Sequence, residues 1–379
     1  MKTLGVGMAG YGFMGRMHSY SHASLSFVYD PPPALIKLVG VCAVTQKSRH
    51  LAVERAGYEF STPDFNDLCA RDDIDIINVC TPNYLHFEQV MAALKAGKHV
   101  YCDKPLAMNC REAEQMAAQA RQVGTTCQVT FHNRFCPAIM RAKQLVEAGF
   151  VGDVLSFRAR YLHSGEVDPM RPMRWRLERE KSGGGAIVDL GSHAIDLLRH
   201  LIGEFSRVQA SLRTVFDQRP VSAGSSEMGQ VDVDDVAVLQ LETACGALGL
   251  LEASRIATGA HDDLQFEIHG TKGALAFNLM QPNYLRVYDQ TKPKNELGGD
   301  RGWTQIECIQ NYPKPASLPG GSCPVGWTRF HVASIYEFVR NVAESRPGSP
   351  SFEDGLAVQK VIDAAIRSSE SGGWEDIVS

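Results

Sequence analysis

The chain has 379 residues, of which 44% are hydrophobic, and its 38 basic and 43 acidic side chains leave a formal net charge of −5. Its length predicts about two or three domains, with enough residues to bury a core without disulfide or metal staples. No basic run stands out, which argues against nucleic acid or an anionic membrane as a partner. No segment reaches the ~18 consecutive apolar residues of a membrane span.

The cysteines and the start of the chain bear on its cellular compartment. The ten cysteines are scattered without CxxC pairs, which favours buried thiols in a reducing compartment. The segment Met1–Val6 runs directly into a strand and lacks the apolar region and cleavage site of a signal peptide. We therefore expect the protein in the cytoplasm.

The N-terminal part of the chain alternates predicted strands and helices. Strands are expected at Thr3–Ala9, Lys37–Val44, Asp75–Cys80, His99–Cys102 and Thr126–Thr130. Helices are expected over Gly15–Ser24, after Phe87 and after Asn109, which looks like an N-cap because Glu112 follows three residues later. Ser26–Ala34 includes three consecutive prolines and is expected to be a loop. This alternation predicts a parallel, doubly wound sheet, the Rossmann fold, over residues 1–127.

The remainder, residues 128–379, shows a different pattern. Strands are expected at Asp153–Tyr161, Ser206–Phe216, Val231–Glu242, Ala247–Ala253, Leu264–His269 and Ala274–Phe277. Successive strands with few helices between them predict an α+β domain with a large, open-faced, mainly antiparallel sheet. One face of this sheet looks too polar for burial on both sides within one subunit, so it is a candidate surface for packing on another subunit.

Helices and loops complete the second domain. One long helix is expected near Asp189–Leu201, and Asn283–Pro324, rich in Gly, Pro, Lys and Asn, is expected to form loops. Two helices, His331–Ala343 and Asp354–Ser368, close the chain and are candidates to pack back on the first domain.

A glycine-rich turn follows the first strand: Gly10-Tyr11-Gly12-Phe13-Met14-Gly15. In a GxGxxG turn the first glycine permits the tight bend, the second lets the backbone approach a pyrophosphate, and the third lets helix and strand pack closely. The phosphates then lie at the helix N-terminus, where free N–H groups favour negative charge. Alone the motif is weak evidence, but its place between a strand and a helix is the context that dinucleotide binding requires.

The end of the second strand bears on the choice between NAD and NADP. Ala43 or Val44 stands where an Asp or Glu would favour the ribose hydroxyls of NAD. The following Thr45, Lys47 and Arg49 are candidates for the adenosine end, and the two cations could meet a 2′-phosphate, although they could equally be solvated residues opening a helix. The pattern leans slightly towards NADP or dual use.

Three further segments carry a resemblance to a known family. They are Cys80-Thr81-Pro82-Asn83-Tyr84-Leu85-His86, Cys102-Asp103-Lys104-Pro105, and the run from Gly183-Gly184-Gly185 through Asp189 and His193 to Asp196. Together with the glycine turn and His18, they resemble the glucose–fructose oxidoreductase / inositol dehydrogenase / MocA (Gfo/Idh/MocA) family. The resemblance covers essentially the whole chain, including the final Pro350–Leu356 segment.

The resemblance implies a Rossmann domain, an open-faced sheet through which subunits associate as dimers or tetramers, and an active site between the domains. It implies that Lys104 lies near the nicotinamide and the substrate hydroxyl, in a motif that is usually Glu-Lys-Pro and here has Asp103 instead. Asp189 and His193 match the family's second catalytic motif. Thr81, Pro82, Asn83 and His86 are expected at the cofactor, and Arg134 lies in a segment that resembles one near the family's substrate, although it could equally be a surface charge. Trp175 and Arg176 precede the glycine triplet and could line a sugar pocket, although Trp175 could equally be a packing residue.

The spacing of Asp189 and His193 is consistent with a shared catalytic role, because residues four apart share a helix face. Asp196 and His200 continue the polar stripe, and an ordinary amphipathic helix would explain it equally well without Lys104 and the glycine turn. His18 and His22 are also four apart, but no third ligand with suitable spacing accompanies them, so no metal site is expected.

Together these features predict an NAD(P)-dependent dehydrogenase that transfers a hydride between the cofactor and a hydroxyl carbon of a sugar, inositol or related polyol. Two alternatives remain open. One is a glycoside hydrolase or lyase that oxidises its substrate only transiently, and the other is a non-catalytic cofactor-binding regulator.

Overall fold

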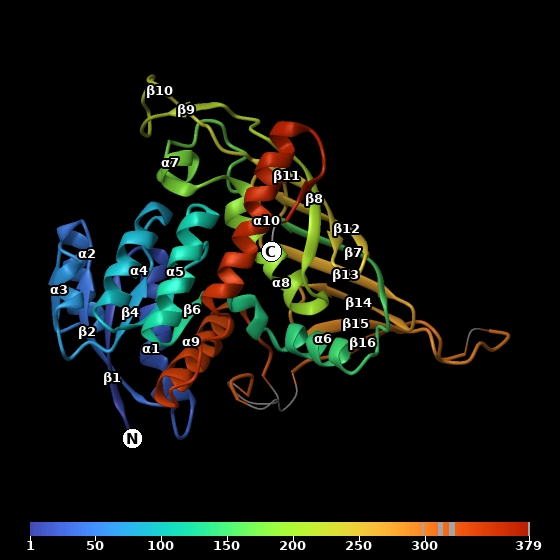
Figure 1. Ribbon diagram of the computed structural model, residues 1–379, viewed down its shortest axis with the longest axis horizontal. Helices are drawn as coiled ribbons and strands as arrows, with labels where there is room; N and C mark the ends of the chain where they lie inside the picture. The colour runs from blue at the N-terminus through green and yellow to red at the C-terminus, as the bar shows by residue number, and fades with distance from the viewer. Residues whose placement is uncertain (298, 310–313, 318–322, 378–379) are drawn as a thin grey trace. The chain divides into compact units, whose positions relative to one another are not determined.

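The computed structural model describes residues 1–297, 299–309, 314–317 and 323–377 (Figure 1). These residues form two compact units. Unit 1 consists of Met1–Phe135, Asn311–Gly321 and Gly326–Gln359, and unit 2 of Cys136–Gln310, Ser322–Val325 and Lys360–Ser379.

Unit 1 is built on a six-stranded parallel sheet in the order β3-β2-β1-β4-β5-β6. Its strands are β1 (Thr3–Ala9), β2 (Leu35–Cys42), β3 (Phe60–Thr62), β4 (Ile76–Val79), β5 (His99–Cys102) and β6 (Cys127–Val129). The helices between them are α1 (Phe13–Val28), α2 (Gln46–Ala56), α3 (Asn66–Cys69), α4 (His86–Lys95) and α5 (Cys110–Val123). The strand order reverses between β1 and β4, which is where a doubly wound sheet binds its ligand.

The predicted Rossmann fold is confirmed, with two differences in detail. The short strand β3 was not predicted, because Phe60–Thr62 is too brief to show a period. Helix α1 continues to Val28, so the predicted loop begins three residues late. The N-cap prediction is confirmed: the Asn109 side chain accepts from the Glu112 amide at 3.0 Å.

Helix α9 (Trp327–Ala343) belongs to unit 1 although it lies far along the chain. Its apolar side chains, Ile335, Phe338 and Val339 among them, share one buried core with Leu4 and Leu25. Residues 128–135 also belong to unit 1, whereas the predicted boundary of the first domain lay after residue 127. The sequence made this helix a candidate to pack on the first domain but could not show which residues its apolar face would contact.

Unit 2 is built on a nine-stranded sheet in the order β16-β15-β14-β13-β7-β12-β11-β8-β17. Its strands are β7 (Val154–Leu162), β8 (Phe205–Arg213), β11 (Val236–Thr243), β12 (Leu248–Ser254), β13 (Asp263–Gly270), β14 (Gly273–Asn278), β15 (Tyr284–Asp289), β16 (Trp303–Glu307) and β17 (Glu375–Asp376). Only the β7–β12 pair is parallel, so the prediction of a mainly antiparallel sheet is confirmed.

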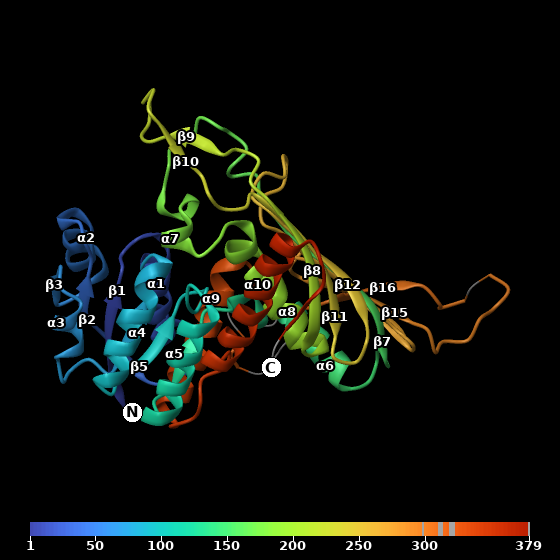
Figure 2. The same cartoon turned by 45° about the horizontal axis from the view of Figure 1, so that its top comes forward.

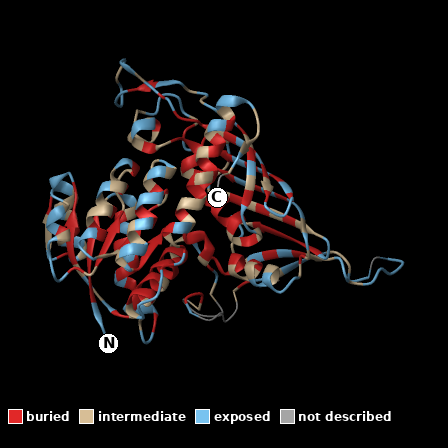
Figure 3. Cartoon of the chain, viewed as in Figure 1, coloured by how far each residue is buried: buried red, intermediate tan, exposed pale blue. Residues whose placement is uncertain are grey.

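The two faces of this sheet differ in burial. Helices α6 (Pro137–Glu147) and α8 (Ser192–Ile202) pack on one face (Figure 2). Residues alternate accordingly along β12, where Leu251 and Ala253 are buried while Leu248 and Leu250 are exposed (Figure 3). Within the described part of unit 2, no helix covers the face that bears Leu248 and Leu250.

Two segments of unit 2 form strands that were not predicted. The predicted loop over 283–324 is wrong in part, because β15 and β16 form there; residues 298, 310–313 and 318–322 of that segment lie outside the described residues. Strand β15 does alternate buried and exposed residues, but the surrounding Gly, Pro, Lys and Asn obscured this period. The hairpin of β9 (Gln218–Pro220) and β10 (Met228–Gln230) was also not predicted.

The predicted helix near Asp189–Leu201 forms as a π-helical turn, Ile187–Gly191, followed by α8. Of the predicted polar stripe, His193 and Asp196 are buried, at 5% and 1% exposed, and Asp189 and His200 are half-buried. No helix among the described residues has the length and hydropathy needed to cross a bilayer.

Candidate functional site

The glycine-rich turn between β1 and α1 has the geometry of a phosphate cradle. Gly10 has φ of +89°, and a side chain there would lie 2.6 Å from the Cys80 carbonyl oxygen. A side chain at Gly15 would collide with the Gly10 carbonyl, whereas a Cβ at Gly12 would meet nothing within 4 Å. The first and third glycines therefore close the turn, and the second leaves open space beside the N-terminus of α1. These residues fit the pyrophosphate of a dinucleotide.

Near this turn lies Trp327, a residue that the sequence did not single out. Phe13 is 62% exposed, and its ring stacks on Trp327, the first residue of α9, with centroids 5.8 Å apart. Tyr11 contacts Tyr58 edge to face, and Met14 is half-buried. Trp327 brings α9 to the glycine turn, a contact between residues more than 300 positions apart that no local sequence signal reveals.

The end of β2 shows how the NAD/NADP candidates lie. Thr45 caps α2 by accepting from the Ser48 amide at 3.1 Å. One nitrogen of the Arg49 guanidinium donates to the carbonyls of Ala43 and Val44, at 2.7 and 2.8 Å. Lys47 is exposed. The Arg49 guanidinium is thus partly occupied by the backbone carbonyls of Ala43 and Val44. The exposed Lys47 ammonium is accessible to a phosphate.

The loops after β4 and β5 are joined through His86, which is 0% exposed. Its Nδ1 lies 2.9 Å from the Pro105 carbonyl oxygen, and its Nε2 lies 3.1 Å from the Thr81 carbonyl oxygen. Burial lowers the pKa of this histidine, against the opposing effect of Asp103. A fully buried ring cannot touch a cofactor, so His86 holds together the segments that carry Thr81, Pro82 and Asn83 and the Lys104–Pro105 pair.

Asp103 and Lys104 occupy the turn that follows β5. The Asp103 carboxylate accepts from the Lys104 amide at 2.9 Å and is 9% exposed. Lys104 is half-buried. The shorter Asp side chain therefore bonds within its own turn, and it fixes the backbone from which the Lys104 side chain extends.

Arg134 is buried rather than a surface charge. It is 9% exposed, and its guanidinium lies 3.0 Å from the carboxylate of Asp354 at the start of α10 (Phe352–Ser371). Burial raises the pKa of Asp354, but Arg134 and the Ser351 amide outweigh it and hold that pKa below its usual value. Arg134 therefore joins the end of the Rossmann chain to α10 within unit 1, and Asp354 is its partner that the sequence did not indicate.

Four buried histidines of unit 1, His18, His22, His132 and His331, lie near one another. Asn78 on β4 links His18, at 3.0 Å, to His22, at 3.2 Å. His331 of α9 stacks on His132, with centroids 3.8 Å apart, and lies 5.6 Å from His18. Burial lowers the pKa of both His18 and His22 to about 3, and that of His331 far below its usual value. Among the described residues no set of histidines, cysteines and carboxylates is arranged to hold a metal ion.

In unit 2, the π-helical turn and α8 carry Asp189 and His193. Asp189 is half-buried, and His193 is 5% exposed. The ring of Tyr161 on β7 lies edge-on to the His193 ring at 5.8 Å, and the Tyr161 hydroxyl donates to Asp262 at 2.6 Å. His163 also contacts Asp262, at 3.3 Å. The sheet thus places the Tyr161 ring, whose hydroxyl bonds to Asp262, against His193, a contact that the sequence did not indicate.

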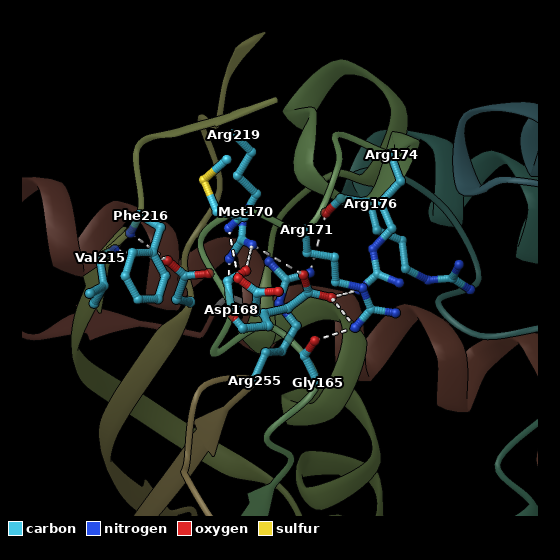
Figure 4. Close-up of polar contacts among 12 residues, drawn as sticks. Gly165, Asp168, Met170, Arg171, Arg174, Arg176, Val215, Phe216, Arg219 and Arg255 are labelled. Atoms are coloured by element: carbon cyan, nitrogen blue, oxygen red, sulfur yellow. Dashed lines mark hydrogen bonds and ion pairs between the residues drawn. The ribbon is translucent and has the colours of Figure 1, made fainter. Parts of the chain in front are cut away.

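Trp175 and Arg176 lie in a short helical turn, and Figure 4 shows Arg176 beside a group of charged residues. The Arg176 guanidinium lies over the Trp175 ring at 4.2 Å. Glu166, only 1% exposed, forms an ion pair with Arg174 and lies 3.7 Å from Arg171. Arg219 of β9 is fully buried and donates to the carbonyls of Glu166 and Asp168 at 2.7 and 2.6 Å. The hairpin therefore holds the segment that precedes Trp175 and Arg176.

Both units match profiles of one family. Residues 4–131 match "Oxidoreductase family, NAD-binding Rossmann fold", and residues 139–276 match "GFO/IDH/MocA C-terminal domain". The chain belongs to the Gfo/Idh/MocA oxidoreductase family. It is an oxidoreductase with an NAD-binding domain, as its glycine turn predicted.

Characterised members of this family align along the whole chain. Levoglucosan dehydrogenase of Pseudarthrobacter phenanthrenivorans is 34% identical over 100% of this chain and 99% of its own length. Inositol 2-dehydrogenase of Rhizobium meliloti is 27% identical over 97% of both chains. The structure of a levoglucosan dehydrogenase with NADH and levoglucosan superposes with a TM-score of 0.92 over 100% of both chains, at 34% identity.

Proposed function

We propose that this Gfo/Idh/MocA member is a dehydrogenase that oxidises a hydroxyl carbon of a sugar, an anhydrosugar or an inositol, with a nicotinamide dinucleotide as cofactor. The observation that carries this proposal is the full-length similarity to levoglucosan dehydrogenase, which extends over both units. The glycine cradle in unit 1 and the Asp189–His193 pair in unit 2 both lie within the matched ranges.

The chemistry assigns a role to each of three residues. His193 acts as the general base that takes the proton of the substrate hydroxyl, because imidazole titrates near neutral pH. The Lys104 ammonium stabilises the negative charge that develops on that oxygen. Asp189 orients the substrate by accepting from a neighbouring hydroxyl. A bound nicotinamide would supply the acceptor for the hydride that leaves the carbinol carbon. Trp175 and Arg176 offer an aromatic face and hydrogen-bond donors to a sugar ring.

The test is the absorbance of reduced nicotinamide, with levoglucosan, inositols, aldoses and simple glycosides supplied one at a time. Growth of the signal with one of them supports the dehydrogenase. A flat signal with cleavage of a glycoside, detected by its released aglycone, would instead show transient oxidation. If neither reduced nicotinamide nor cleavage is detected while the cofactor still binds, the result would support a non-catalytic regulator.

For the cofactor, we propose that NADP is accepted beside NAD. No carboxylate stands at Ala43 or Val44 to repel a 2′-phosphate, and Lys47 is exposed nearby. We expect Val44→Asp to lower kcat/KM for NADP about 10- to 100-fold while changing that for NAD less than about threefold, since each tenfold step corresponds to only ~1.4 kcal/mol of added repulsion. Val44 is 89% exposed, so the substitution should leave the fold intact. Equal losses with both cofactors would contradict this placement.

We further propose that subunits associate as a dimer or tetramer through the open face of the unit 2 sheet. Val238, Leu248, Leu250 and Trp303 share that face by register and are 43–50% exposed. Light scattering coupled to gel filtration should find an oligomer, and Leu250→Glu should shift it towards the monomer. Met280→Glu, at a 51% exposed position outside the strands, is the matched control. A monomeric native protein would refute the proposal.

For location, we propose the cytoplasm. All ten cysteines are free thiols, and Cys42, Cys102, Cys127, Cys136 and Cys308 are buried. Such thiols suit a reducing compartment. Fractionation of the native host with an antibody against the protein would test this.

A further inference from the structure

One buried residue, Asp234, accepts hydrogen bonds from three consecutive backbone amides, two at its carboxylate and one at its carbonyl. It lies two residues before β11 and is 5% exposed. Its two carboxylate oxygens accept from the amides of Gly185 and Ile187, each at 2.8 Å. Its carbonyl oxygen accepts from the Ala186 amide at 2.9 Å. The whole segment from Gly185 to Ile187 is therefore held by a single residue.

This segment opens directly into the turn that carries the proposed catalytic residues. Ile187 begins the π-helical turn that includes Asp189, and α8 with His193 follows without a break. The Asp189 amide donates to the Gly185 carbonyl at 2.9 Å. A side chain at Gly185 would collide with the Asp234 backbone, so glycine is needed for this close approach. Any displacement of Gly185 relative to Asp234 moves the start of the turn that sets the position of Asp189.

A second buried residue, Arg255, connects Asp234 to the Trp175–Arg176 turn. Figure 4 shows Arg255 within the group of charged side chains. It follows β12 and is 4% exposed. Its guanidinium donates to the Asp234 carbonyl at 3.0 Å and to the Arg176 carbonyl at 3.2 Å. Its own carbonyl accepts from the Glu166 amide at 2.9 Å. Arg255 thus bonds directly to the Trp175–Arg176 turn, and it is linked to the Asp189–His193 element through Asp234.

We propose that Asp234 and Arg255 are positioning residues that set the distance between the Asp189–His193 element and the Trp175–Arg176 turn. The inference rests on the proposed function, because it assigns them to the substrate contacts of that reaction. Misplacement of a reacting group by about 1 Å can cost about 10²-fold in rate, so two residues that hold these elements together should act on turnover without touching the sugar.

The neighbouring residue Asp235 provides a matched control. It is 0% exposed, and one of its carboxylate oxygens accepts from the amides of Val215 and Phe216, at 2.8 and 3.1 Å. It thus resembles Asp234 in burial and in receiving two amides, but those amides belong to the segment after β8. Asp234→Asn leaves one buried amide facing an NH₂ group, because each of its two oxygens accepts one amide, and it should lower the melting temperature. Asp235→Asn removes a buried carboxylate in the same way but can keep both of its amides on the one remaining oxygen.

The two variants should differ in kinetics. We expect Asp234→Asn to lower kcat for the sugar at least about 30-fold, with the KM for NAD changed less than about twofold, and Asp235→Asn to keep kcat within about threefold. Unchanged kcat in Asp234→Asn, or equal losses in both variants, would reduce Asp234 to a structural role.

Should Asp234→Asn fail to fold, Arg255→Lys decides. An ammonium group can donate to one of the two carbonyls but does not span both as the planar guanidinium does. The KM for the sugar should rise at least about fivefold, with the KM for NAD unchanged. Arg171→Lys is the control, because Arg171 belongs to the same charged group and is 42% exposed at its side chain. A KM and kcat within twofold of native in Arg255→Lys would overturn the proposal.

Hydrogen exchange separates this inference from the proposed function. Amides from 185 to 193 should exchange at least about tenfold faster in Asp234→Asn than in the native protein, and at the native rate in Asp235→Asn. If the native protein oxidises no sugar, the proposed function fails, and the exchange rates alone then test the positioning. Unchanged exchange in Asp234→Asn would show that the carboxylate does not hold the turn.

Discussion

Replacing Lys104 or His193 by alanine should lower kcat for sugar oxidation about 10³-fold and leave the dissociation constant of NAD within about threefold. General base catalysis contributes about 10²–10⁴ to such rates, and one charge-stabilising donor about 10²–10³. The glycine turn that cradles the dinucleotide is unchanged in both variants, so binding should persist. Steady-state kinetics with the best substrate, together with quenching of tryptophan fluorescence by the cofactor, would measure both quantities.

Two surface residues serve as controls for these substitutions. Lys95→Ala at the end of α4 and His261→Ala in unit 2 each remove the same type of side chain from an exposed position. Both should retain kcat within about twofold. Near-normal turnover in Lys104→Ala and in His193→Ala would remove these residues from the mechanism, while loss of cofactor binding in both would point to misfolding.

Unit 1 should unfold steeply as the pH falls below about 5.5, because its buried histidines are neutral. The folded pKa of His18 and His22 is about 3, against 6.5 for an ordinary histidine, and that of His331 is also far below 6.5. Above pH 6.5 the three side chains are neutral in both states, so stability is undiminished. Below it only the unfolded chain binds these protons, and each histidine removes up to about 1.4 kcal/mol per pH unit. Three together can offset a typical domain stability of about 5–15 kcal/mol within a few pH units.

Thermal unfolding followed by circular dichroism between pH 7 and 4 measures this effect. His331→Phe keeps a ring against His132 and Trp327 but cannot take up a proton. It should leave the melting temperature at pH 7 equal or higher and shift the acid unfolding midpoint to lower pH. His50→Gln, at an exposed position on α2, should change neither. A native acid midpoint insensitive to His331→Phe would show that its protonation does not drive the transition.

Within unit 1, local patterns were sufficient to predict most of the fold. The alternation of apolar strands with helical periods predicted five of the six parallel strands, because a strand buried on both faces reads as a continuous apolar run. The glycine turn needed three small residues at fixed spacing, and the collisions that side chains would cause at Gly10 and Gly15 explain that spacing. Asn109 and Glu112 marked a helix start through bonds made within four residues.

Other features depended on partners distant in the chain. Arg134 could have been a surface charge or a substrate contact until Asp354, 220 residues away, proved to be its ion-pair partner. His86 looked like a cofactor contact, but its burial makes it a link between two loops. Strand β15 carried the right period inside a composition typical of loops, and only its pairing with β14 and β16 distinguishes the two.

By itself, then, the sequence determined the Rossmann fold, the dinucleotide turn and the family, because each of these depends on periodicity or on spacing within a short segment. The tertiary structure alone decided which core residues of unit 1 α9 contacts, that four buried histidines meet, and that Asp234 and Arg255 bond to the segments bearing Asp189 and Arg176. The physical reason is that burial and long-range hydrogen bonds arise from residues far apart in the chain, and such partners leave no local pattern by which they could be matched.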